Sequence, residues 1–149
     1  MPPDTTKEKT NEVGLYNYAL SYFRAAQILA KADFDVTHPD APTLNLYYHS
    51  VELFLKSFLV FKGKTIDDVK KIGHRVDCLA KTCGDLGLSF DDEDTVVIRL
   101  MSEDNTIIRA RYIEVRCFIR PTIEALDRTC ISLHSSVRKA LKTAGRPVR

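Results

Sequence analysis

The sequence LNLYYHSVELFLKSFLVFK, at residues 44–62, decides the fold of this chain. Its polar interruptions are Asn45, His49, Glu52 and Lys56, at spacings of 4, 3 and 4 residues. On a helix these spacings place the four side chains in one narrow stripe. Nearly every other position holds Tyr, Val, Leu or Phe, so such a helix must be covered on several sides. The stretch therefore predicts a helix at the centre of an all-α bundle.

Length and composition are typical of a single soluble domain. The chain has 149 residues, of which 44% are hydrophobic and 28% charged. We predict one helical-bundle domain over residues 12–144, preceded by a disordered lead-in over 1–11 and followed by a disordered basic tail over 145–149. The net charge of +2 gives no global field that would recruit nucleic acid, so any such binding needs a local patch.

The cysteines and the apolar runs limit the cofactors and the cellular location. The four cysteines are Cys78, Cys83, Cys117 and Cys130, and no two of them stand at the spacing of a zinc site. We therefore expect buried free thiols, no metal and no cofactor. No signal-peptide core is visible, and no apolar run approaches the ~20 residues that a bilayer crossing needs. These features favour a cytoplasmic protein that makes no membrane contact.

The first predicted helix spans residues 12–32, where a polar face opposes an apolar one. Pro39 and Pro42 cannot sit in a helix interior, so we expect the central helix to begin after them and to run over 43–62. The apolar face of the first helix carries Leu15, Tyr18, Ala19, Tyr22, Ala26 and Leu29.

Short helices are predicted after the central one. Gly63 is a good terminator, and Thr65 with Asp68 resembles a capping pair for a short helical turn that Gly73 closes. His74 then opens another amphipathic helix.

The last part of the chain contains a helix, an ambiguous run and a final helix. Ser89 with Asp92 resembles a further cap, for a helix over 91–103. Residues 106–120 alternate apolar and charged side chains in part, so we expect an extended or irregular segment. Pro121 fits a first helical position and starts the final helix.

Glu52 admits two interpretations. It stands four residues before Lys56, which is the favourable order for an exposed ion pair on a solvated seam. Alternatively, Glu52 points inward and meets His74, which would tie two helices together and fix the histidine tautomer.

Two further groups are candidates for chemistry. Positive charge interleaved with aromatic rings suits single-stranded nucleic acid, and this pattern occurs at Arg109, Arg111, Tyr112, Arg116, Phe118 and Arg120. Solubilising charge explains the same residues equally well. Arg128 and His134 lie six residues apart in the final helix, so their side chains diverge by about 120° around the axis.

The order of these features resembles that of HEPN-domain proteins. The central helix reads H-x-x-E-L-x-L-K from His49 to Lys56, and a glycine, a short turn and the pair Gly73-His74 follow. An Arg-Tyr pair at residues 111–112 precedes the final helix. The likeness covers about residues 12–142 and is most specific over 46–80.

This resemblance implies an up-and-down bundle of four to five helices, usually a homodimer, in a toxin–antitoxin or defence context. Active HEPN ribonucleases carry Arg-x4–6-His near the start of the last helix. Arg128 and His134 fit that spacing, but they lie about two turns inside the predicted helix. Near Arg111, the corresponding positions offer Arg116 but no histidine.

The leading hypothesis is a non-catalytic, HEPN-like dimeric domain that binds RNA, a nucleotide or a partner protein. Its candidate binding residues are His49, Glu52, Lys56, His74, Arg109, Arg111, Tyr112 and Arg116. The first alternative is a metal-independent HEPN endoribonuclease, in which His134 acts as acid and base while Arg128 stabilises phosphate charge. The second alternative is a module that only binds other proteins.

Overall fold

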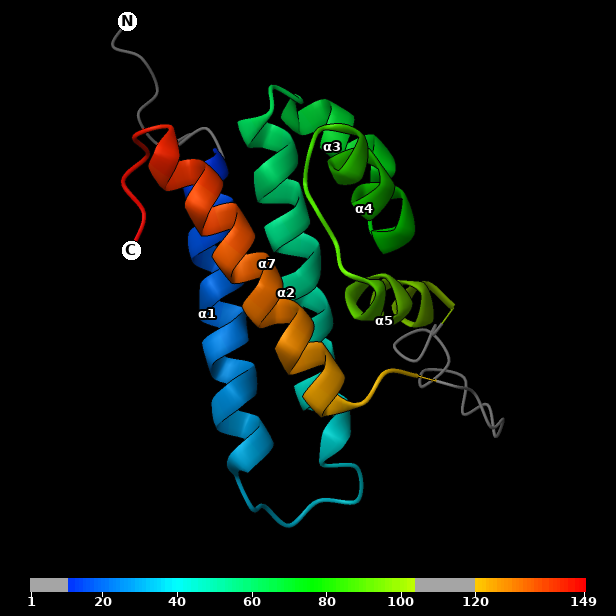
Figure 1. Cartoon of the computed structure of the whole chain (residues 1–149). Coiled ribbons are helices and arrows are strands. Elements are labelled where there is room, and N and C mark those ends of the chain that lie inside the picture. The colour runs from blue at the N-terminus through cyan, green and yellow to red at the C-terminus, as the bar shows by residue number, and fades with distance from the viewer. Residues whose placement is uncertain (1–10, 104–119) are drawn as a thin grey trace, which may run out of the picture.

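A computed structural model of the chain describes residues 11–103 and 120–149. All regular structure within these ranges is helical (Figure 1). The helices are α1 (Glu12–Lys31), α2 (Asp40–Phe61), α3 (Ile66–Ile72), α4 (Val76–Asp85), α5 (Asp92–Glu103) and α7 (Ile123–Thr143). The predicted all-α fold class is confirmed. None of these helices combines the length and the apolar character that a membrane crossing requires.

Helix α2 lies at the centre of the fold, where it packs against α1, α3, α4 and α7. Helices α1 and α2 run antiparallel and α7 crosses them diagonally, while α3, α4 and α5 lie on the other side of α2 from α1 (Figure 1). The buried residues of α2 are Thr43, Leu44, Tyr47, Ser50, Val51, Glu52, Phe54, Leu55, Ser57, Phe58 and Leu59. The prediction of a helix enclosed by its neighbours is therefore confirmed.

Helix α2 begins earlier than the sequence predicts. It starts at Asp40, with Pro39 as N-cap, so Pro42 lies in its first turn. The first N–H groups of a helix have no intrahelical acceptor, and a proline there breaks no hydrogen bond. The expectation that Pro42 excludes a helix was therefore wrong at this end.

The final helix begins later than predicted. Thr122 is the N-cap of α7, and its side chain accepts a hydrogen bond from the Ala125 N–H at 3.1 Å. Pro121 therefore precedes the helix, because a threonine hydroxyl satisfies a free N–H group and proline offers no such acceptor.

Side-chain caps determine where the short helices α3 and α5 begin. Thr65 and Asp68 form the predicted capping box of α3. The cap predicted at Ser89 is wrong, because the Asp91 carboxylate accepts the Asp94 N–H at 2.7 Å and caps α5. His74 does not open α4, which begins at Val76.

The C-terminal tail packs on the bundle, contrary to the disorder expected from its basic composition. The Val148 side chain is buried, at 9% exposed. The Arg149 carbonyl oxygen accepts hydrogen bonds from the Tyr16 hydroxyl at 3.0 Å and from Arg138 Nε at 2.7 Å. These contacts hold in place a segment whose basic composition predicted disorder.

Two expectations fall outside the described residues. They are the lead-in over 1–11, apart from Asn11, and the extended segment over 106–120, apart from Arg120. Asn11 is the N-cap of α1, and its side chain accepts the Gly14 N–H at 2.8 Å.

Candidate functional site

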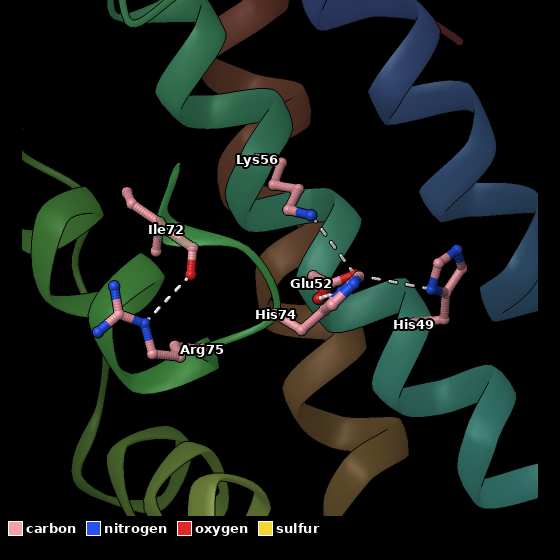
Figure 2. A network of polar contacts seen from close by, with 6 residues as sticks. All are labelled: His49, Glu52, Lys56, Ile72, His74 and Arg75. Atoms are coloured by element: carbon pink, nitrogen blue, oxygen red, sulfur yellow. Dashed lines mark hydrogen bonds and ion pairs between the residues drawn. The ribbon is translucent and has the colours of Figure 1, made fainter. Parts of the chain in front are cut away.

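Glu52 lies at the centre of a polar cluster on α2 (Figure 2). Its side chain is 7% exposed, and its Oε1 lies 2.6 Å from Nδ1 of His74. The interpretation in which Glu52 points inward and meets His74 is confirmed. The ion pair with Lys56 also forms, but it is largely buried, so the solvated seam is wrong. A buried carboxylate needs such partners, because an unpaired charge in the protein interior is costly.

The chain reversal after α3 places His74 over α2. Gly73 ends α3 with a φ of 67°, a conformation that side-chain-bearing residues rarely adopt. Arg75, which follows His74, turns away from Glu52, since its Nε donates to the Ile72 carbonyl oxygen at 3.2 Å (Figure 2).

Two more side chains of α2 complete the cluster. Lys56 Nζ lies 3.6 Å from Glu52 Oε2, and His49 Nδ1 lies 3.7 Å from the same oxygen. The three donors approach the carboxylate from different directions (Figure 2). We call Glu52, His49, Lys56 and His74 the Glu52 cluster.

The side chains around the Glu52 carboxylate differ in their exposure. The His74 side chain is 87% exposed, His49 is 40% exposed and Lys56 is 15% exposed, while the carboxylate lies beneath them. His74 is therefore the most accessible side chain of the cluster.

An aromatic ring borders the cluster. Tyr22, from α1, packs edge-on against His49, with ring centroids 4.4 Å apart and an interplanar angle of 73°. Partial burial lowers the pKa of His49 below its ordinary 6.5, and Lys56 and His74 lower it further, against the opposing effect of Glu52. The sequence placed Tyr22 only on the apolar face of its helix, and no local pattern indicates its contact with His49.

Arg128 and His134 contact different parts of the fold. Arg128 forms an ion pair with Glu93 of α5. The His134 ring instead lies among aromatic residues of α1 and α2, with centroids 5.8 Å from Tyr16 and 6.0 Å from Phe54. Its Nε2 is buried without a hydrogen-bond partner, and burial lowers its pKa. The divergence expected from their spacing is present.

The other candidate binding residues lie outside the described ranges. They are Arg109, Arg111, Tyr112 and Arg116. Arg120, the last of the basic group, is described and exposed, and it borders a groove of about 400 Å³ between α5 and the start of α7.

Within the described residues, no three His, Cys, Asp or Glu side chains are arranged to hold a metal ion. Cys83 and Cys130 are buried free thiols, Cys78 is half-buried, and Cys117 lies outside the described ranges. Burial raises the pKa of Cys83 to about 12, so this thiol stays protonated at neutral pH.

The chain matches no protein-family model, no curated protein and no solved structure.

Proposed function

We propose that this chain is a non-catalytic, HEPN-like domain that binds RNA or a nucleotide through a phosphate group at the Glu52 cluster. One observation carries the proposal: a buried carboxylate of α2 holds three positively charged or protonatable side chains, two from α2 and His74 from the α3–α4 connection. The carboxylate orients these groups, and the His74 side chain, which is 87% exposed, faces solvent.

The donor set suits phosphate oxygens. Lys56 supplies an ammonium group, and His49 and His74 each supply a ring N–H when protonated. Tyr22 adds an aromatic side chain beside them. Positive charge next to an aromatic ring favours a nucleotide over a phosphate without a base, because bases pack against aromatic side chains.

The positions of Arg128 and His134 support a domain without ribonuclease activity. A ribonuclease of the HEPN type needs both side chains at one phosphate. Arg128 is paired with Glu93, whereas the free nitrogen of His134 is buried beneath α1 and α2 side chains. Within one chain, these contacts direct the two groups to separate environments.

A homodimer, in a toxin–antitoxin or defence context, forms part of the proposal through the HEPN resemblance. Exposed apolar side chains supply surface for such an interface, including Ile28 on α1, at 72% exposed, and Ile131 on α7, at 50% exposed. Light scattering of the purified protein tests the dimer, and a monomer at micromolar concentration would contradict it.

The binding proposal is tested with fluorescently labelled single-stranded RNA at low salt, where phosphate contacts are strongest. We expect Lys56→Gln and His49→Gln each to weaken binding by about tenfold, because each removes a phosphate donor. Lys139→Gln and His38→Gln are matched controls at exposed positions on α7 and on the α1–α2 connection.

Three outcomes decide among the hypotheses. Binding that the two cluster variants leave unchanged would contradict the phosphate site. Absence of RNA retention at low salt would favour a module that only binds proteins. RNA cleavage in EDTA that His134→Ala abolishes would show that the domain is an enzyme.

A further inference from the structure

We infer that residues 145–149 form a detachable strap that controls access to Tyr16 and His134. When the strap is closed, as in this structure, the two side chains are covered, and when it opens they become accessible. The inference does not depend on the proposed phosphate site, because no residue of the Glu52 cluster takes part in it.

The strap leaves α7 at a glycine. Gly145 follows the C-cap residue Ala144 and has a φ of 79°, in the left-handed region that favours glycine. The Arg146 N–H donates to the Leu141 carbonyl oxygen at 2.9 Å, which closes the turn. The turn directs the strap onto the end of the bundle where α1 begins (Figure 1). Gly145 is therefore the hinge about which the strap opens.

Few contacts attach the strap to the bundle. Val148 is buried, at 9% exposed, and the other four residues of the strap are exposed. Arg146 Nε lies 2.8 Å from Glu12 Oε1, and the Arg149 carbonyl oxygen accepts two hydrogen bonds. Hydrogen bonds and partly exposed ion pairs each contribute little net free energy, and the entropy lost in ordering the strap opposes them. The strap can therefore detach while the helices remain folded, as segments with few buried contacts do.

The closed strap covers Tyr16 and a neighbour of His134. The Tyr16 hydroxyl donates to the Arg149 carbonyl oxygen at 3.0 Å, and Tyr16 is fully buried. The Tyr16 ring stacks on the His134 ring, with centroids 5.8 Å apart and an interplanar angle of 22°. Arg138, which donates to the same Arg149 oxygen at 2.7 Å, lies about one helical turn after His134 on α7. The strap thus holds two groups beside His134, whose Nε2 is buried without a hydrogen-bond partner among the described residues.

The surroundings of His134 favour its neutral ring. Burial lowers the pKa of His134 below 6.5, and the positive charges of Arg24 on α1 and Arg138 on α7 lower it further. The neighbours from α1 and α2 that contact the ring, Tyr16 and Phe54, are uncharged. His134 is therefore neutral at pH 7, which is the form that reacts with acylating reagents. Slow acylation at that pH reports shielding of the ring and not its protonation.

Diethyl pyrocarbonate, which acylates neutral imidazole, tests the strap in the full chain at pH 7. Mass spectrometry gives the rate at each histidine, and the exposed His38 and His74 are internal references. We expect His134 in the wild type to react about tenfold more slowly than His38, because its reaction requires the strap to open. Equal rates at His134 and His38 would overturn the inference.

A charge at the buried position should open the strap. We expect Val148→Asp to raise the rate at His134 about tenfold and to leave the two reference histidines unchanged. Val96→Asp, at an exposed valine of α5, is the control and should leave the rate at His134 unchanged. Hydrogen exchange reports the strap itself: the N–H groups of Arg146 and Val148 should lose protection while those of α1 and α2 keep it.

Arg146→Gln provides a milder variant that decides the matter if Val148→Asp unfolds the bundle. It removes the ion pair with Glu12, so the rate at His134 should rise about threefold while the helices stay protected. Strap N–H groups that lose protection while His134 reacts at the wild-type rate would show that the strap does not shield this residue. Strap N–H groups that keep their protection in every folded variant would show that the strap does not detach. Either result overturns the inference.

Discussion

At the scale of single residues, burial has different consequences for two polar side chains, Glu52 and His134. Glu52 is buried and contacts His74, Lys56 and His49. His134 is set among aromatic rings, and its Nε2 has no partner. Burial of the second side chain lowers the pKa of His134 and favours its neutral form.

The His74–Glu52 hydrogen bond should contribute measurably to stability. We expect His74→Ala to lower the free energy of unfolding by about 1 kcal/mol, because it removes the hydrogen bond between His74 and the buried Glu52 carboxylate. The exposure of His74 to solvent limits the size of this effect. Urea unfolding measures the change. His38→Ala is the control and should fall within about 0.5 kcal/mol of the wild type; an equal effect of both variants would contradict the role of His74.

His134 should make the fold less stable in acid. Burial, Arg24 and Arg138 lower its pKa below 6.5 in the folded chain, so the unfolded chain binds its proton first as the pH falls. The free energy of unfolding therefore keeps its full value with respect to this group above about pH 6.5, and it falls as the pH drops below that. We expect His134→Phe to reduce the fall in melting temperature between about pH 7 and pH 5. An unchanged fall would contradict this explanation.

At the scale of helices, polar contacts fix how neighbouring elements pack. Ser50, on α2, donates to the Ala19 carbonyl oxygen of α1 at 2.8 Å. Thr129, on α7, donates to the Asp94 carboxylate of α5 at 2.8 Å, and both residues are buried. Such bonds constrain the register of packed helices, because an unmade bond leaves a buried polar group without a partner.

The Thr129–Asp94 bond provides a test at this scale. Thr129→Val keeps the side-chain shape and removes the donor, so we expect a loss of about 1–2 kcal/mol in unfolding free energy. Burial already raises the pKa of Asp94, and losing this hydrogen bond should raise it further. Thr82→Val, whose hydroxyl donates within its own helix to the Cys78 carbonyl oxygen, is the control. Chemical denaturation that shows equal losses would contradict the interhelical role.

At the scale of the whole molecule, the described helices share one core that includes the C-terminal tail. Val148 belongs to the same apolar cluster as residues of α1, α2 and α7. Arg146 Nε also lies 2.8 Å from Glu12 Oε1, at the opposite end of the described chain. The tail thus joins the first and last helices.

Tail packing predicts a difference between two valines. Val148→Ser should lower the unfolding free energy by about 1 kcal/mol, because it replaces a buried apolar side chain with a polar one. Val36→Ser is the control at a site that is 51% exposed, and it should be nearly neutral. Equal melting temperatures for the two variants would indicate that the tail does not pack.

The sequence by itself determined the helical class, the central position of α2 and the cap of α3. Each of these follows from a short range: the spacing of polar residues within residues 44–62, or Thr65 and Asp68 three positions apart. Such patterns depend only on residues within a few turns of one helix, so they can be recognised in the sequence before the fold is known. The start of α2 was predicted too late, because the sequence did not reveal that Pro42 lies in the first turn of the helix.

Only the tertiary structure decided which polar groups meet. Glu52 and His74 stand 22 residues apart in the sequence. The four-residue spacing of Glu52 and Lys56 was equally compatible with a solvent-exposed ion pair between those two residues. Tyr22 and the C-terminal tail acquired their roles in the same way, through neighbours remote in the chain. The physical reason is that the free energy of a polar side chain depends on the partners that surround it, and those partners are set by the packing of separate helices.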